Sequence, residues 1–389
     1  MRTSTSRART AGMVAATGAL TLVAACGGSS TPSASSTASS ASTSPASTSA
    51  GQAAEIAAAQ AIVDKSTATP TTINQKIPLI RKVDPGKTYV FLQCELSQCK
   101  LIGDGAVEAA KAIGWKTKVI PWKTSDPSTL VSALKQALQY NPIAVTPTGF
   151  PQALWGTVEA EYKKAGVLIV PAAVANVTTS VTVPGGASTG FDYKASGVIM
   201  GNWLIADSKA AAHALVMDVP AYEVLKDYGD AAKATIKAGC AACVLTPLDI
   251  TIPQLSSNGV VPAIVAALQK DTSIKYVVAT DGAFLGGLPS ALKAAGLTGI
   301  KIAGGAPSVT NLQNLTNDTE QAWTGEPIGK FGWVIVDIIA RASLGMVVPE
   351  ADGGRPQQLL TKANVGTPKE SLDAPVDYRD QYKKLWGLS

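Results

Sequence analysis

The stretch Lys164-Ala165-Gly166-Val167-Leu168-Ile169-Val170 joins the end of a predicted helix to a predicted strand. Glycine readily takes the left-handed conformation that ends a helix, and a lysine in the last turn interacts favourably with the helix dipole. The same joint, an apolar helix that ends in lysine and glycine before a β-rich run, recurs at three further places. These are 111–120, 237–245 and 293–302. The chain therefore repeats a helix-to-strand unit.

Further predicted strands lead from these joints into the next helix. They are 89–92, 143–145, 214–217 and 276–279. Continuous apolar strands that alternate with helices indicate parallel sheets covered on both faces. One series runs from Thr88 to Pro171 and a second from Ala195 to about Gly304, and the stretch 174–189 between them is typical of a hinge. We expect an α/β fold of two Rossmann-like lobes, joined by a hinge that the chain crosses several times, with a ligand cleft between the lobes.

The expected segments follow from these patterns and from chain length, because about 300 residues are more than one compact unit usually holds. The extension before the first lobe begins with a short helical patch, 53–65. The segments are a signal peptide at 1–25, a lipid anchor and linker at 26–52, an N-terminal extension at 53–86, lobe 1 at 87–175 completed by about 326–350, lobe 2 at 190–305, and a C-terminal segment at 351–389.

The N-terminus has the pattern of a bacterial lipoprotein signal. Arg2, Arg7 and Arg9 precede an apolar stretch too short to span a bilayer, and small residues lead to Cys26 in the run Leu22-Val23-Ala24-Ala25-Cys26. In such a signal the cysteine becomes the acylated N-terminus, and more than one acyl chain gives stable anchoring. The alternative is an ordinary cleaved signal peptide with an incidental cysteine. We expect a lipidated Cys26 that anchors an extracytoplasmic protein to the cell membrane.

Residues 27–51 consist almost entirely of Ser, Thr, Ala, Pro and Gly and carry no charge. A segment without large apolar side chains cannot offset its chain entropy, so we expect a disordered tether. The formal net charge of +5, from 33 basic and 28 acidic residues, includes the three signal arginines. Without these arginines, 30 basic residues remain against 28 acidic ones, and so small a net charge does not favour a nucleic-acid partner. The longest later apolar stretch, 333–348, is interrupted by Asp337 and Arg341, so no further membrane span is predicted.

Four of the five cysteines form two close pairs, Cys94 with Cys99 and Cys240 with Cys243. Outside the cytoplasm this arrangement favours two local disulfides. A zinc site made from all four thiolates is an alternative, although the two spacings differ. A redox-active motif at Cys240-Ala241-Ala242-Cys243 is a third, but it lacks the Trp and Pro usual around thioredoxin-like sites.

Several stretches taken together are similar to one known family. They are 105–114 as a first helix, 191–197 as a crossing into the second lobe, 279–283 with 291–296 as a strand, turn and helix, and Glu326-Pro327 with Gly332 as a return crossing. The region from about Lys87 to Gly366 thereby resembles the type I periplasmic solute-binding proteins of ABC importers, the group that includes ribose- and galactose-binding receptors. The resemblance implies a two-lobed receptor with a small-molecule ligand and with permease and ATPase subunits as partners.

The chain departs from that family where its sugar binders hold their ligand. In the family's sugar binders, aromatic residues usually follow the first strand, where this chain has Leu96 to Cys99. An Asp-Arg pair usually follows the fourth strand, where this chain has Ala172-Ala173-Val174. The family's arginine falls near Lys226, its asparagine at Thr280, and its Gly-Phe-Asp-Gly strand end at Gly304-Gly305-Ala306-Pro307. Sugar recognition depends on such bidentate groups. A plain pentose or hexose is therefore not the expected ligand.

The remaining candidates are polar and aromatic residues at or near the predicted strand ends and the hinge. Polar tips beside aromatic faces suit a small, partly apolar ligand. The tryptophans and Phe150 also suit core packing, Asp281 suits a helix cap, and Lys226 suits a solvated surface. The ligand-binding candidates are Gln93, Glu95, Gln98, Trp122, Phe150, Tyr222, Lys226, Asp249, Thr280, Asp281 and Glu326.

Enzymatic functions are not favoured. The single histidine, His213, offers little for a catalytic triad or a histidine-rich metal centre, and no phosphate-binding loop occurs. Asp249 and Asp281 could serve glycoside hydrolysis only as residue types. We expect a monomeric, lipid-anchored solute-binding receptor of an ABC importer, without metal or cofactor. The alternatives are a ligand sensor for a signalling partner and, less favoured, an extracytoplasmic hydrolase.

Overall fold

Lobe 1 is built on a four-stranded parallel sheet. The computed structural model describes residues 45–185, 190–325, 328–347, 357–369 and 374–388, and the signal peptide and Cys26 lie outside them. The side chains from Tyr89 to Leu92 are fully buried, because helices cover both faces of the sheet. The strands are β1 (Thr88–Gln93), β2 (Lys116–Pro121), β3 (Ala144–Thr146) and β4 (Leu168–Ile169), in the order β2-β1-β3-β4.

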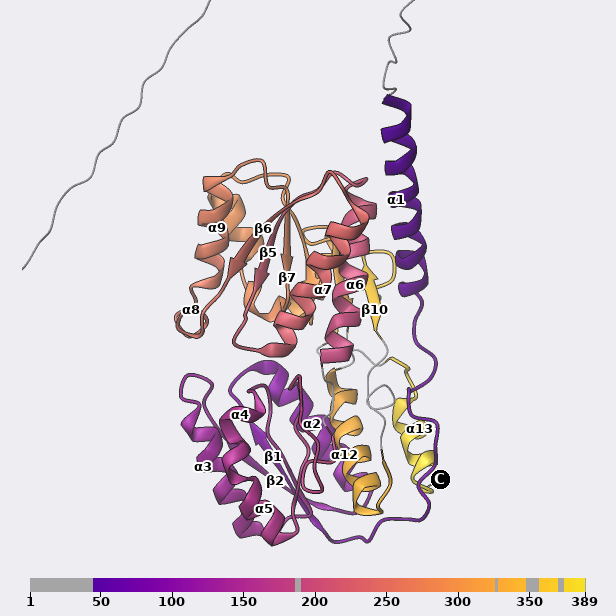
Figure 1. Cartoon of the computed structure of the whole chain (residues 1–389), viewed down its shortest axis with the longest axis vertical. Helices are drawn as coiled ribbons and strands as arrows, with labels where there is room; N and C mark the ends of the chain where they lie inside the picture. Colours follow the sequence, from indigo (N-terminus) through magenta and orange to yellow (C-terminus); the bar gives the residue numbers. More distant parts are fainter. Residues whose placement is uncertain (1–44, 186–189, 326–327, 348–356, 370–373, 389) are drawn as a thin grey trace, which may run out of the picture. The chain divides into compact units, whose positions relative to one another are not determined.

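The helices of lobe 1 come from two parts of the chain (Figure 1). A helix from near the C-terminus, α12, packs directly against α2, which follows β1. The helices are α2 (Ser97–Ala112), α3 (Ser128–Ala137), α4 (Gln152–Trp155), α5 (Glu159–Ala165) and α12 (Ile328–Ser343), with short 3₁₀ turns η1 (Leu138–Tyr140) and η2 (Gly156–Val158).

Lobe 2 contains a six-stranded sheet in the order β10-β9-β8-β7-β5-β6. All neighbours are parallel except β10, which runs antiparallel to β9. The sheet extends beyond the expected boundary at Gly305, because β9 and β10 come from later segments. The strands are β5 (His213–Asp218), β6 (Val244–Asp249), β7 (Tyr276–Ala279), β8 (Lys301–Gly305), β9 (Ala322–Gly325) and β10 (Gln358–Thr361).

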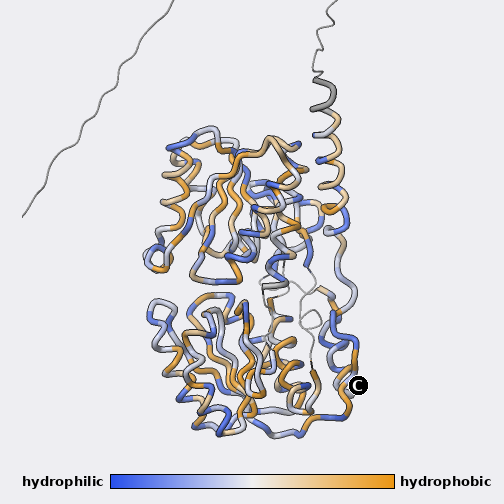
Figure 2. Tube along the Cα trace, in the orientation of Figure 1, coloured by the Kyte–Doolittle hydropathy of each residue, from blue (hydrophilic) through white to orange (hydrophobic). Residues whose placement is uncertain are grey.

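Helices also flank the sheet of lobe 2, with α6 and α7 packed against each other. Hydrophobic residues follow the strands through the middle of each lobe (Figure 2). These elements confirm the predicted α/β fold with two parallel-sheet lobes. The helices are α6 (Gly190–Asp207), α7 (Glu223–Gly239), α8 (Ile252–Ser256), α9 (Val260–Lys270), α10 (Leu288–Ala294) and α11 (Val309–Thr316), and the 3₁₀ turn η3 spans Gly282–Leu285.

The N-terminal extension begins with α1 (Pro45–Ser66), which starts before the expected helical patch at Ala53. The expectation of a disordered tether is therefore wrong for residues 45–51, which are helical. Alanine-rich sequence favours propagation of a helix once it has formed. Ala59 and Val63 of α1 are buried against the main core, and α1 packs on α6 of lobe 2. The described helices include none that is both long enough and apolar enough to cross a membrane.

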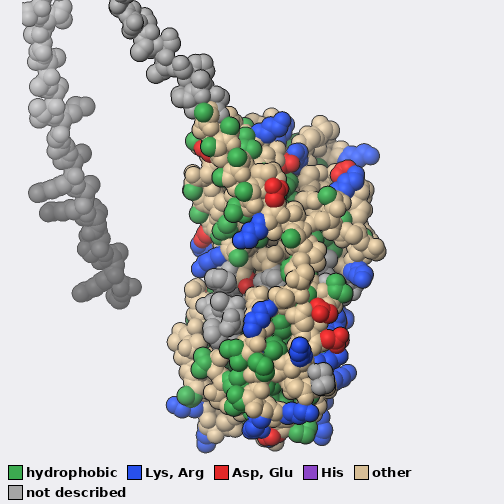
Figure 3. Space-filling model, turned by 90° about the vertical axis from the view of Figure 1, so that its right-hand side faces the viewer, with side chains coloured by type: hydrophobic (Ala, Val, Ile, Leu, Met, Phe, Trp, Pro, Cys, Tyr) green, Lys and Arg blue, Asp and Glu red, His purple; other side chains and the backbone are tan. Residues whose placement is uncertain are grey.

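The C-terminal helix α13 (Tyr378–Leu385) packs on α12 of lobe 1. Trp386 stacks on Trp333 with ring centroids 5.2 Å apart, and its indole Nε1 donates to Asp337 at 2.8 Å. The extension runs beside this helix, because Leu79 N donates to Leu385 O at 2.8 Å. On the face that carries α1 and α13, hydrophobic side chains gather over the lower half, while charges of both signs are scattered (Figure 3).

Candidate functional site

The loop after β1 is held by the disulfide between Cys94 and Cys99. The bridge ties the end of β1 to the first turn of α2, and both cysteines are buried. A second disulfide joins Cys240 and Cys243 between α7 and β6. Both predicted pairings are therefore confirmed, and the four thiols that a zinc site would need are used in disulfides.

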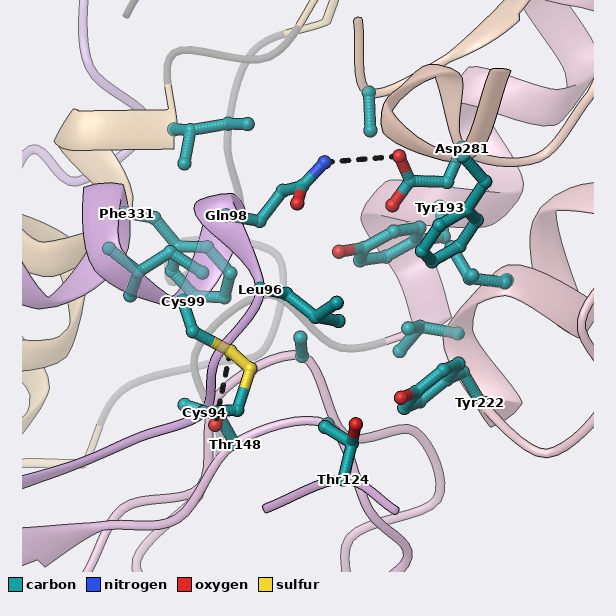
Figure 4. Close-up of a pocket in the computed structure, with 18 of the residues that line it drawn as sticks. Cys94, Leu96, Gln98, Cys99, Thr124, Thr148, Tyr193, Tyr222, Asp281 and Phe331 are labelled. Carbon is teal, nitrogen blue, oxygen red and sulfur yellow. Dashed lines mark hydrogen bonds between the residues drawn. A yellow bond between two sulfur atoms is a disulfide. The ribbon is translucent and has the colours of Figure 1, made fainter. Parts of the chain in front are cut away.

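A cavity of about 80 Å³ lies beside this loop, and its walls come from both lobes (Figure 4). We call it the hinge-side cavity, because Ala173, Tyr193 and Ile328 line it close to the points where the chain passes between the lobes. Its other lining residues are Cys94, Leu96, Gln98, Cys99, Ile102, Trp122, Thr124, Thr148, Gly149, Tyr222, Val224, Leu225, Asp281, Phe284, Ala306 and Phe331.

One hydrogen bond crosses this cavity from lobe to lobe. Gln98 Nε2, in the first turn of α2, donates to Asp281 Oδ1, after β7, at 3.1 Å (Figure 4). The same carboxylate oxygen accepts from Ala283 N at 2.9 Å and so caps η3. The structure thus gives Asp281 the capping role expected from the sequence and also a place in the cavity wall.

Aromatic rings form a second contact between the lobes. Phe150 of lobe 1 lies between Trp122 and Tyr222, with ring centroids 5.4 Å from each. Tyr222 belongs to lobe 2, where it precedes α7. The buried indole Nε1 of Trp122 has no hydrogen-bond partner among the described residues. A buried donor without a partner is costly, and a ligand acceptor would relieve that cost.

Glu95 organises the polar edge of the cleft. Its carboxylate accepts from Thr124 N at 3.1 Å and from Thr124 Oγ1 at 2.5 Å. Desolvation acts to raise the pKa of Glu95, but the hydrogen bonds from Thr124 outweigh it and the pKa is lowered. Burial raises the pKa of Tyr222 to about 12, although a hydrogen bond with Thr124 acts in the opposite direction. Glu95 is therefore anionic and Tyr222 neutral at physiological pH.

A larger space of about 520 Å³ adjoins the hinge-side cavity, and we call it the mouth-side chamber. The two spaces share Leu96, Thr124, Tyr222 and Phe284 as wall residues. The chamber is otherwise lined by Glu95 and Ser125 of lobe 1 and by residues of α8, α9 and η3 of lobe 2 with their flanks, namely Ile252, Leu255, Ser256, Asn258, Val260, Val261, Ala283 and Gly286.

Most residues that line the hinge-side cavity, Thr148 and Tyr193 among them, were not ligand candidates in the sequence analysis. Ala173 and Ala306 both line the hinge-side cavity, and both have left-handed backbone, with φ of 54° and 45°. Such conformations are uncommon for alanine and cluster at functional sites. The sequence feature that could have indicated these two alanines is their position, because both lie in stretches where the chain departs from the sugar-binding pattern. Because the side chains of both alanines are small, they do not fill the cavity.

The predicted candidates fall into separate places. Gln98, Trp122, Tyr222 and Asp281 line the hinge-side cavity, Glu95 lines the mouth-side chamber, and Phe150 packs between two of these rings. The others do not line either space. Gln93 is half-buried at the end of β1, and Thr280 is buried after β7. Asp249 and Lys226 are exposed, and Lys226 pairs with Asp230. Glu326 lies outside the described residues.

Comparison with known proteins agrees with this architecture. The model of the periplasmic binding protein domain matches residues 97–345. No curated protein sequence matches the chain. A 5-methylthioribose transporter solute-binding protein from Thermotoga lettingae has a similar structure, with a TM-score of 0.65, 16% identity, and coverage of 81% of this chain and 100% of that one.

Two further solved structures are similar at the level of the fold. An ABC sugar transporter subunit from Rhodobacter sphaeroides has a TM-score of 0.61 and 18% identity, with coverage of 72% of this chain and 99% of that one. A glucose-galactose binding protein from Geobacillus stearothermophilus has a TM-score of 0.61 and 16% identity, with coverage of 73% and 100%. Since the domain model spans well over half of the sequence, the chain belongs to the periplasmic binding protein family, a family of binding proteins rather than enzymes.

Proposed function

We propose that this protein is the extracytoplasmic solute-binding receptor of an ABC-type importer. It captures a small molecule between its lobes and delivers it to a permease driven by an ATPase. The observation that carries the proposal is the hinge-side cavity, whose wall joins Gln98 of lobe 1 to Asp281 of lobe 2. A ligand that touches both walls does so fully only when the lobes are together.

The mechanism follows from this differential contact. A ligand shifts a two-state equilibrium only by as much as it binds one state better than the other. Contacts with Tyr222 and Asp281 on one side and with Gln98 and Trp122 on the other favour the closed arrangement. A permease that recognises the closed arrangement would then receive only loaded receptor. The similar proteins described as an ABC sugar transporter subunit and as a 5-methylthioribose transporter binding protein support this assignment.

The proposal includes attachment to the membrane through Cys26. The run Leu22-Val23-Ala24-Ala25-Cys26 and the tether behind it support this part. Because only the acyl chains would hold the protein, Cys26→Ser should move it from the membrane fraction to the soluble fraction without changing its unfolding temperature. Retention of this variant at the membrane would contradict the anchor and leave the receptor function in place.

A thermal-shift screen of small solutes tests the receptor function. A ligand that binds only the folded protein raises the unfolding temperature as its concentration exceeds the dissociation constant. For a solute that gives a shift, Asp281→Ala should weaken binding by roughly 1–3 kcal/mol, because the lobe-to-lobe hydrogen bond from Gln98 that favours the closed arrangement is lost. Titration calorimetry on both proteins measures the difference.

The matched control is Asp249→Ala, which removes an exposed carboxylate from the end of β6 in the same lobe. This variant should bind the solute as the unaltered protein does. Equal losses in both variants would place the ligand outside the hinge-side cavity. A screen in which no solute raises the unfolding temperature would count against a binding function altogether.

A further inference from the structure

The hinge-side cavity and the mouth-side chamber are adjacent spaces of unequal size. Four wall residues, Leu96, Thr124, Tyr222 and Phe284, belong to both. The chamber measures about 520 Å³ and the cavity about 80 Å³. The chamber alone falls in the range of ordinary small-molecule sites, which is roughly 300–1,000 Å³. A ligand body that fills the chamber can therefore reach into the cavity with one small group.

The size of the cavity limits that group. A cavity of about 150 Å³ lined by apolar side chains is known to hold benzene. The hinge-side cavity, at about 80 Å³, has about half that volume. It accommodates a branched group of three or four non-hydrogen atoms and excludes a phenyl ring or a whole sugar ring.

The wall of the cavity favours an apolar group. Ile102, Val224, Leu225 and Phe331 line it together with the Cys94–Cys99 disulfide. Two of its polar side chains, Gln98 and Thr148, already have protein partners, whereas the buried Nε1 of Trp122 has none among the described residues. Gln98 donates to Asp281, and Thr148 Oγ1 donates to Leu92 O at 3.4 Å. One ligand acceptor atom beside the apolar group can pair with Trp122 Nε1, but a further polar atom would have to displace one of these bonds or remain unpaired, and both are unfavourable.

The wall of the mouth-side chamber is mixed, with apolar side chains such as Leu255 and Val261 beside polar ones, and suits an uncharged body that has both polar and apolar faces. Thr124, Ser125, Ser256 and Asn258 supply hydroxyl and amide groups there. Among the described residues that line the two spaces, the only charged side chains are the carboxylates of Glu95 and Asp281. An anionic ligand would meet like charge without a compensating lysine or arginine.

We infer that the ligand is an uncharged polyhydroxylated molecule with one small alkyl or alkylthio substituent, the substituent entering the hinge-side cavity and the polar body occupying the mouth-side chamber. This inference rests on the proposed receptor function and names its substrate class. Ala173 and Ala306 make room for the substituent where a larger polar clamp would fill the space.

Matched ligand sets test the inference on the full chain by titration calorimetry. Each set contains the free sugar and its methyl, isopropyl and phenyl thioglycosides, for ribose, xylose, glucose and galactose. Since each buried methylene strengthens binding by roughly fourfold, the isopropyl derivative of the preferred sugar should bind at least tenfold more tightly than the methyl derivative. The phenyl derivative should bind more weakly than the isopropyl one, and the corresponding glucuronide, which carries a carboxylate, should not bind.

Two variants assign the effect to the cavity. Val224→Phe fills it and should abolish the advantage of the isopropyl group, whereas Val244→Phe, at an exposed valine of β6, should leave the advantage intact. Ile102→Ala enlarges the cavity and should restore binding of the phenyl derivative. This second variant keeps the test decisive where the larger side chain at 224 prevents folding.

The outcomes separate the inference from the proposed function. Free sugars that bind as tightly as their isopropyl derivatives would overturn the inference and leave the receptor function standing. Binding of the glucuronide equal to that of the glucoside would overturn the assignment of an uncharged body. If no member of any set binds and the thermal-shift screen finds other solutes, the substrate class is wrong; if that screen also finds nothing, both proposals fall.

Discussion

Asp218 ends β5 with a carboxylate that is almost fully buried, at 2% exposure. Desolvation raises its pKa to about 6 from the usual 3.8, although Lys233, 3.7 Å away, and a hydrogen bond from Val219 N act to lower it. The folded state therefore favours the protonated form. The stability contributed by this group is fully present below pH 4 and is lost as the pH rises through 6.

Asp218→Asn should remove this dependence, because asparagine has the same shape and does not ionise near these pH values. The free energy of unfolding of the native protein, measured relative to that of the variant, should fall by up to about 3 kcal/mol between pH 4 and pH 7. Urea unfolding at several pH values measures the difference. Asp249→Asn, at the exposed end of neighbouring β6, should follow the native profile. A native-like profile for Asp218→Asn would show that this carboxylate is ionised throughout.

The sequence could predict only in part which individual side chains line the site. Parallel strands bring their carboxyl ends to one edge, and residues that follow β1, β2, β5 and β7 lie in the walls of the two spaces between the lobes. Asp249 and Lys226 do not line them, since β6 is the outer strand of its sheet and Lys226 turns toward Asp230. The direction of a side chain after a strand depends on the loop conformation, and the left-handed backbone of Ala173 is not visible in sequence.

At the scale of elements, α2 and α12 approach each other until their backbones touch. A Cβ atom at Gly332 would lie 1.9 Å from Ala106 N, and one at Gly105 would lie 2.0 Å from Gly329 O. Both glycines therefore permit the close packing that attaches the C-terminal part of the chain to lobe 1. Backbone atoms cannot rotate away from an added methyl group as a side chain can.

Gly332→Ala should destabilise the protein by about 3 kcal/mol or more, because overpacking against backbone forces the two helices apart. The control is Gly51→Ala in α1, where an added Cβ meets nothing within 4 Å. That variant should keep or raise the stability by about 0.4–1 kcal/mol. Urea unfolding of both variants gives the comparison. Equal effects in the two would mean that the helix contact contributes little to stability.

The elements differed in how far they could be predicted. Three of the four predicted helix-to-strand joints, at Gly114, Gly166 and Gly296, have a left-handed glycine. At the fourth, Gly239 is still part of α7, and the extended residue Cys240 follows it. The strands β9 and β10 were not expected, because their sequences, Ala-Trp-Thr-Gly and Gln-Leu-Leu-Thr, lack the continuous apolar run of the predicted strands. Their place in the sheet of lobe 2 depends on pairing between segments distant in sequence, which local patterns do not encode.

At the scale of the whole binding unit, the chain passes between the two lobes several times. After α6 to α11 and β9 in lobe 2, α12 packs in lobe 1, β10 pairs with β9 in lobe 2, and α13 returns to α12. Repeated crossing limits the relative motion of the lobes to a hinge. The sequence pattern predicted two lobes and a hinge, whereas the contacts that set their separation arise only from the folded arrangement.

Those contacts are the Gln98–Asp281 hydrogen bond and the rings of Phe150 and Tyr222. A hydrogen bond to a charged group contributes about 1.5–3 kcal/mol net, which changes an equilibrium by roughly tenfold or more. Gln98→Ala should therefore shift the ligand-free protein toward the open arrangement. Energy transfer between dyes at Tyr140 of lobe 1 and Val244 of lobe 2, both exposed positions, reports the shift as a longer mean distance.

Gln93→Ala is the matched control, because Gln93 lies at the end of β1 near Gln98 but outside the cleft wall. It should leave the distance unchanged. Only the closed population binds the ligand fully, and Gln98→Ala lowers that population. The apparent dissociation constant should therefore rise by the factor by which the closed population falls, in addition to the effect of any direct contact between Gln98 and the ligand. An unchanged dye distance in Gln98→Ala would mean that the aromatic contact and the crossings at the hinge hold the lobes together without this bond.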